Sequence, residues 1–64
     1  MKHFKENLLF YRKQVHMTQK ELALKLGVSV NNVGHWEKGR TEPNIETLIK
    51  ISEIFDISLD ELLK

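Results

Sequence analysis

Sixty-four residues, of which 41% are hydrophobic, are enough for one small domain with a thin core, expected over residues 1–64. The chain contains no cysteine, which excludes disulfide bonds and thiolate metal sites and fits a reducing cytoplasm. No apolar run has the length of a secretion signal or a membrane span, so we expect a cytoplasmic protein without a membrane partner.

The formal net charge of +1 hides an uneven distribution of charge along the chain. Residues 1–41 carry eight Lys or Arg against three Asp or Glu, whereas residues 42–64 carry two against six. A basic part joined to an acidic part makes a polarised molecule, which favours a partner of high negative charge. Two ordinary solvated faces would give the same pattern, so charge alone leaves both interpretations open.

The first predicted helix covers about residues 4–15, because apolar residues recur there at the spacing of one buried stripe. That stripe consists of Phe4, Leu8, Tyr11 and Val15. Leu9 and Phe10 fall outside it, and they are either lone exposed apolar residues or a contact for a partner or a second copy. If the backbone after this helix is left-handed, His16 adopts that conformation with some strain.

A capping box predicts the start of a second helix over residues 19–26. There the Thr18 hydroxyl and the Glu21 carboxylate can each satisfy a free backbone N–H, and a glycine marks the end of the helix. Ser29 caps a third helix, expected over about residues 30–38 and again ended by a glycine. The turn between these two helices is too short for an antiparallel pair, so they must cross steeply in a helix-turn-helix arrangement.

The outer face of the third helix separates this motif, about residues 18–39, from an ordinary corner of two helices. At about 100° per residue, one side of the helix carries Val33, Trp36 and Glu37. The opposite side carries Asn31, His35 and Lys38. An ordinary surface helix more often carries Glu and Lys there, whereas short amides can form paired hydrogen bonds with base edges.

Two further helices are predicted after a loop at Pro43. Asn44 caps the first, over about residues 45–55. Its broad apolar face consists of Ile45, Leu48, Ile51, Ile54 and Phe55, with Ile49 at its edge. Asp56 is a residue that tolerates a left-handed end, and a second capping box, between Ser58 and Glu61, starts a final helix over residues 59–63. The fold class is therefore all-α, with five helices.

No pattern in the sequence points to catalysis or to a bound group. There is no nucleophile elbow, no phosphate-binding glycine loop and no HExxH pair. The histidines do not have metal-ligand spacing: they are His3, His16 and His35. We therefore expect no enzyme, no metal and no cofactor.

The stretch TQKELALKLGVSVNNVGHWEKGR resembles the helix-turn-helix of bacterial phage repressors and Cro proteins, also called the xenobiotic-response-element family. The similarity covers about residues 4–63. Its matching pieces are Thr18-Gln19, Glu21-Leu22-Ala23, Gly27-Val28-Ser29, Glu37-Lys38-Gly39, Pro43 and the C-terminal SLDELL. This resemblance implies a five-helix, lambda-repressor-like domain that regulates transcription, most often as a repressor, with the third helix in the major groove of duplex DNA.

The resemblance also implies roles for residues at matching positions. Base-reading roles fall on Val30, Asn31, Asn32 and His35, since an amide can pair with adenine and a valine can contact a thymine methyl. Phosphate contacts fall on Thr18, Gln19, Lys38 and Arg40. The family's brace between the first motif residue and the first reader cannot form here, because Val30 lacks a polar group. An ion pair is expected between Arg12 and Glu37.

Family resemblance further implies a homodimer on a palindromic operator. A second class of function remains open from the sequence, because some proteins with this fold act through protein partners, as antitoxins or regulator-binding modules do. The Leu9-Phe10 pair and the acidic C-terminal third are compatible with that alternative. Salt dependence separates the two classes, since DNA binding must weaken steeply with ionic strength through counterion release.

Overall fold

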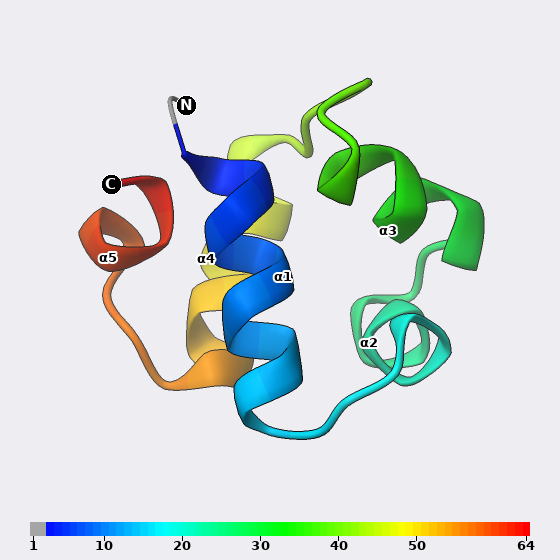
Figure 1. Cartoon of the computed structure of the whole chain (residues 1–64), viewed down its shortest axis with the longest axis horizontal. Coiled ribbons are helices and arrows are strands. Elements are labelled where there is room, and N and C mark those ends of the chain that lie inside the picture. The colour runs from blue at the N-terminus through cyan, green and yellow to red at the C-terminus, as the bar shows by residue number, and fades with distance from the viewer. Residues whose placement is uncertain (1–2) are drawn as a thin grey trace.

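The computed structural model describes residues 3–64, which form five α-helices and no strand. The helices are α1 (Phe4–Gln14), α2 (Gln19–Leu26), α3 (Val30–Glu37), α4 (Ile45–Phe55) and α5 (Leu59–Leu63). In Figure 1, α1 runs through the middle in front of α4, with α2 and α3 on one side and α5 on the other. The predicted all-α, five-helix class is confirmed, with α1 and α3 each ending one residue earlier than expected. None of the helices described in residues 3–64 combines the length and apolarity that a membrane crossing requires.

Four of the five helices begin at a side chain that accepts a hydrogen bond from the backbone three residues later. These caps are Thr18, Ser29, Asn44 and Ser58. The two predicted capping boxes are complete, because Glu21 and Glu61 accept the backbone N–H of their caps at 2.8 Å and 3.1 Å. Hydrogen bonds from the Thr18 N–H and hydroxyl hold the pKa of the exposed Glu21 below its ordinary value. Short helices gain most from such caps, since a large share of their N–H groups lies in the first turn.

Four helix ends share a left-handed residue, and two of these residues are not glycine. The four are His16, Gly27, Gly39 and Asp56, with φ between 55° and 74°. At each of these ends the following N–H returns to a carbonyl five residues earlier, the pattern of a Schellman motif. The left-handed backbone that the sequence analysis considered at His16 and Asp56 is present, and a side chain with a Cβ is strained there.

Every helix contributes one fully buried side chain to a single core. These are Leu8, Leu22, Val33, Ile51 and Leu62, each within 2% of complete burial. Each such burial contributes roughly 1.5–3 kcal/mol. Because α3 is held through Val33 and its neighbour one turn on, Trp36, the opposite face of α3 is left to the solvent.

Two residues of the predicted apolar faces, and Ile49 at the edge of one of them, lie outside this core. Val15 is 49% exposed, because α1 has already ended and the residue only caps it. Ile45, the first residue of α4, is 57% exposed. The expectation that both were buried is therefore wrong. Phe10 is 56% exposed, as its position off the stripe predicts.

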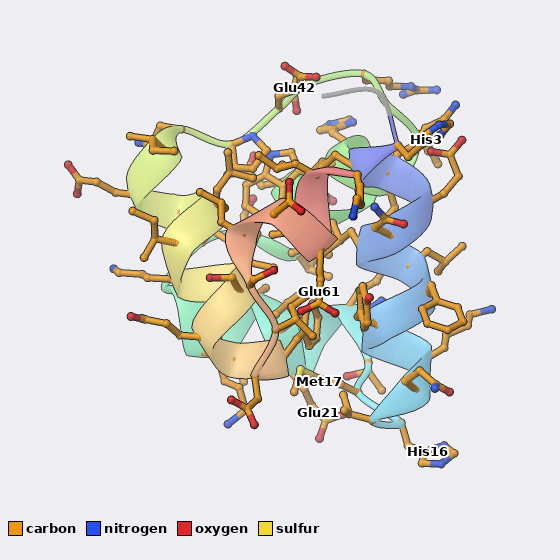
Figure 2. All side chains as sticks on the ribbon, turned by 90° about the vertical axis from the view of Figure 1, so that its left-hand side faces the viewer. His3, His16, Met17, Glu21, Glu42 and Glu61 are labelled. Carbon is orange, nitrogen blue, oxygen red and sulfur yellow. The ribbon has the colours of Figure 1, made fainter. Side chains whose placement is uncertain are left out.

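Replacement of His16 by glycine should stabilise the protein. The His16 side chain is exposed and points away from the fold in Figure 2, so His16→Gly removes left-handed strain without removing a packing contact. We expect the free energy of unfolding to rise by about 1 kcal/mol in urea denaturation. The matched control Lys50→Gly, in the exposed middle of α4, should lower it by about 1 kcal/mol. A loss of stability at both positions would contradict this account of the turn.

Candidate nucleic-acid interface

The inner side of α3 fixes which residues face outward. Val33 and Trp36 are buried in the core, and the side chain of Glu37 is only 7% exposed. This side packs against both α1 and α2. Since the helix is bound along one face, residues on the other face cannot rotate into the interior.

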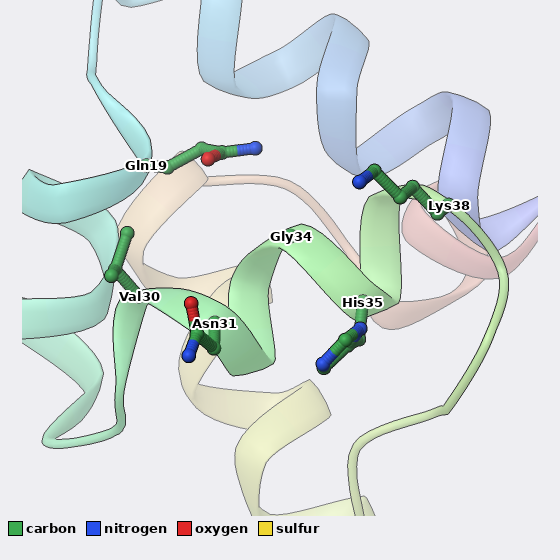
Figure 3. A pocket seen from close by; sticks show the side chains of 6 residues that line it. All are labelled: Gln19, Val30, Asn31, Gly34, His35 and Lys38. Carbon is green, nitrogen blue, oxygen red and sulfur yellow. The ribbon is translucent and has the colours of Figure 1, made fainter.

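The outer face of α3 forms one side of an open hollow of about 360 Å³, called here the α3 hollow. It is lined by Gln19, Val30, Asn31, Gly34, His35 and Lys38 (Figure 3). Three of the four residues predicted to read bases lie in this lining, and so do two of the four predicted to contact phosphate. The start of α2 and the outer face of α3 thus form one surface, which has both polar and apolar parts.

Three predicted contact residues lie outside the α3 hollow. Asn32 is exposed on the flank of α3, and its backbone N–H is held by the Ser29 cap. Thr18 is exposed at the start of α2, where its hydroxyl oxygen accepts from the N–H of Glu21 at 3.0 Å. Arg40 lies beyond α3 and is exposed.

Two exposed cations, Lys38 and Arg40, follow the end of α3. Gly39 has φ of 74°, and the N–H of Arg40 donates to the carbonyl of His35 at 2.9 Å. This turn fixes the backbone from which Lys38 and Arg40 extend into solvent. The ion pairs found within residues 3–64 involve neither cation. Both are therefore able to neutralise an external anion.

The predicted ion pair between Arg12 and Glu37 is present and nearly buried. Arg12 Nε donates to Glu37 Oε2 at 2.6 Å, and Nη2 donates to Oε1 at 3.1 Å. The two side chains are 11% and 7% exposed. The remaining terminal nitrogen of Arg12 donates to the carbonyl of Met17 at 2.8 Å. This arrangement ties α1 and the turn before α2 to the last residue of α3.

Gln19 joins the same carboxylate, a contact that sequence reasoning missed. Its Nε2 donates to Glu37 Oε1 at 2.8 Å, so one amide proton points inward while the rest of the amide borders the α3 hollow. A glutamine at the start of α2 is polar and surface-compatible, and nothing local in the sequence indicates that Glu37 lies beside it. The helix crossing brings the two together.

The titratable side chains are otherwise scattered. Within residues 3–64 no group of three His, Asp or Glu side chains is arranged to hold a metal ion. The chemistry available at the α3 hollow consists of amide and imidazole hydrogen bonding, cationic charge and a small apolar area from Val30.

A family model described as helix-turn-helix matches residues 8–62, which include all of α2 and α3. The chain belongs to the helix-turn-helix family. The uncharacterised HTH-type transcriptional regulator YqaE of Bacillus subtilis is 49% identical over 61 residues, covering 95% of this chain and 53% of YqaE. This domain therefore spans about half the length of that relative.

Two solved structures show how widely this fold is used. The DNA-binding domain of the P22 C2 repressor matches with a TM-score of 0.88 and 36% identity, covering 95% of this chain and 80% of that one. The predicted lambda-repressor-like fold is confirmed by this match. A hydroxypropylphosphonic acid epoxidase from S. wedmorenis matches with a TM-score of 0.84 and 33% identity, covering 92% of this chain and 31% of the enzyme. A fold found in both settings does not dictate activity, so function must be argued from the α3 hollow.

Removing the Glu37 carboxylate should be among the most destabilising single changes. We expect Glu37→Ala to lower the free energy of unfolding by about 3 kcal/mol, because it leaves the nearly buried Arg12 cation unpaired. Gln19→Ala should cost only about 1 kcal/mol, since it removes one of several hydrogen bonds to the carboxylate.

A double-mutant cycle between Arg12→Ala and Glu37→Ala, followed by urea denaturation, isolates the pair from other effects of each change. We expect coupling of about 1–3 kcal/mol. If the two losses simply add, the pair does not stabilise the domain.

Proposed function

We propose that this helix-turn-helix domain binds duplex DNA in a sequence-specific manner and regulates transcription, with α3 in the major groove. The observation that carries the proposal is the α3 hollow, where short amides and an imidazole face outward beside exposed cations. The P22 protein similar to this chain is named a repressor with a DNA-binding domain. Repression is therefore the form of regulation that we propose, and the bacterial cytoplasm is the location that we propose with it.

Base reading falls to the outer residues of α3. The Asn31 amide offers a donor and an acceptor side by side, the pattern that pairs with N6 and N7 of adenine. Val30 offers methyl groups at the adjacent edge of the hollow, and His35 lies one turn after Asn31. Asn32 is exposed on the flank of the helix and reaches a neighbouring base pair in this proposal.

Phosphate binding falls to residues at the two ends of the motif. Thr18 and Gln19 stand at the N-terminus of α2, where free backbone N–H groups and the helix dipole favour an anion. Lys38 and Arg40 stand at the far end of α3. Contacts on both sides of the reading face fix the register of α3 in the groove without reading sequence.

A second candidate function has one specific observation in its favour. An open, mainly apolar hollow of about 390 Å³ lies on α1 and is lined by Glu6, Leu9, Phe10, Lys13 and Gln14. It shares no residue with the α3 hollow, and Phe10 is 56% exposed there. An apolar surface of this kind suits a protein partner, so a protein-interaction module is the competing proposal.

Two substitutions distinguish base readers from phosphate anchors. We expect Asn31→Ala to lose roughly 1–3 kcal/mol of discrimination at one base position per half-site, with the salt dependence of affinity nearly unchanged. Arg40→Ala should weaken binding to all sequences alike and reduce the salt slope by about one unit.

These effects are measured by titrating a duplex selected from a random pool, and its single-base variants, at several salt concentrations. Lys50→Ala removes an exposed cation from α4 and serves as the charge control, with a smaller effect on the slope than Arg40→Ala. Unaltered base preference in Asn31→Ala would reject the reading face. Wild-type binding without sequence preference or salt dependence would favour the protein-interaction proposal.

We further propose that two copies bind a palindromic operator as a homodimer. We expect a monomer or weak dimer of this domain in solution that pairs on DNA. Footprinting should then show two symmetric half-sites about one helical turn apart, roughly 34 Å. Protection of a single asymmetric half-site at saturation would contradict the dimer. Replacing Leu9 and Phe10 by serine tests whether the hollow on α1 contributes to pairing.

A further inference from the structure

Gly34 stands in the interior of α3, where glycine is the least favourable residue apart from proline. Neither of the usual reasons for a glycine applies to it. Its φ is not positive, unlike those of Gly27 and Gly39. Apart from its chain neighbours and the nearby backbone of its own helix, a Cβ built on Gly34 would have no heavy atom within 4 Å, so packing inside the protein does not exclude a side chain. Alanine at this position would make the helix more stable.

The space left open by this glycine belongs to the α3 hollow. Gly34 lies in its lining, one helical turn after Val30 and one before Lys38 (Figure 3). Side chains on a helix lean toward its N-terminus, so a Cβ on Gly34 would extend over the turn that carries Val30. The missing side chain therefore keeps open an area between the Gly34 backbone and the methyl groups of Val30.

This area differs chemically from the rest of the hollow. The bare Gly34 backbone and the 44% exposed Val30 side chain provide an apolar surface. Polar groups surround it, with the amides of Gln19 and Asn31 on two sides and the Lys38 cation beyond. A small apolar group next to a hydrogen-bond acceptor is complementary to such a surface.

One group in the major groove has that description. Thymine presents its C5-methyl there beside the O4 acceptor, and no other standard base presents a methyl group. We propose that the area between Val30 and Gly34, called here the methyl seat, holds the C5-methyl of one thymine in each half-site. Gly34 is thus a specificity-determining residue, because any side chain at this position would occupy the seat. This inference rests on the proposed function and adds the base that the seat selects.

The first test leaves the protein unchanged. Each thymine of a selected operator is replaced in turn by deoxyuridine, which removes the methyl and keeps every hydrogen-bonding group. We expect one position per half-site at which wild-type affinity falls about threefold to fivefold, the effect of one buried methyl. Uniform affinity across all thymine-to-uracil replacements would overturn the inference.

The second test identifies the seat on the protein. Gly34→Ala should raise the thermal midpoint of unfolding, since alanine is the better helix former. The same variant should lose roughly tenfold in affinity for the thymine operator and bind the uracil and thymine versions equally at the sensitive position. Val30→Ala, which removes one wall without filling the seat, should reduce the preference for thymine with a smaller loss of affinity.

The two proposals fail in different ways. If wild-type protein selects a sequence but Gly34→Ala retains both affinity and the preference for thymine, the seat is wrong while DNA reading stands. If Gly34→Ala weakens binding but leaves the preference for thymine intact, the glycine admits the sugar-phosphate backbone and the methyl seat is again wrong. If wild-type protein selects no sequence, the proposed function itself fails.

Discussion

The Glu37 carboxylate is the contact on which the placement of α3 depends. It accepts two hydrogen bonds from Arg12 and one from Gln19, so it joins α1 and the start of α2 to the end of α3. Burying a carboxylate and a guanidinium is costly unless nearly every polar atom is satisfied. Here the fork geometry of Arg12 meets that requirement, and its remaining terminal nitrogen holds the Met17 carbonyl. Hydrogen bonds depend on direction more than hydrophobic contacts do. The network therefore restrains the orientation of α3 relative to α1 and α2.

That orientation determines the shape of the α3 hollow. Gln19 from α2 borders the hollow, and its amide is held by Glu37. A single carboxylate thus sits on the inner side of the surface that we propose to read DNA. Side chains that recognise a ligand act precisely only when a second layer of contacts restrains them. The network supplies such restraint to one side of the hollow, and the core residue Val33 supplies it along α3.

The rest of the domain consists of short helices whose ends are stabilised by local hydrogen bonds. Four caps and four left-handed ends set the helix boundaries almost to the residue. Each helix then adds at least one fully buried residue to the shared core. Because α3 packs through Val33 and Trp36, the residues on its outer surface contribute little to the core. Packing does not explain Gly34, and helix propensity disfavours it, which supports our proposal that this position serves DNA recognition.

The sequence by itself determined where helices begin and end, because caps and left-handed ends depend on hydrogen bonds between residues three to five positions apart. It also determined which face of α3 points outward, and family resemblance supplied the partners Arg12 and Glu37. Only the tertiary structure decided that Gln19 binds Glu37, that Ile45 projects into solvent and that Gly34 borders an open space. These features follow from how helices cross and where their ends project, and no local pattern encodes the distance between residues on different helices.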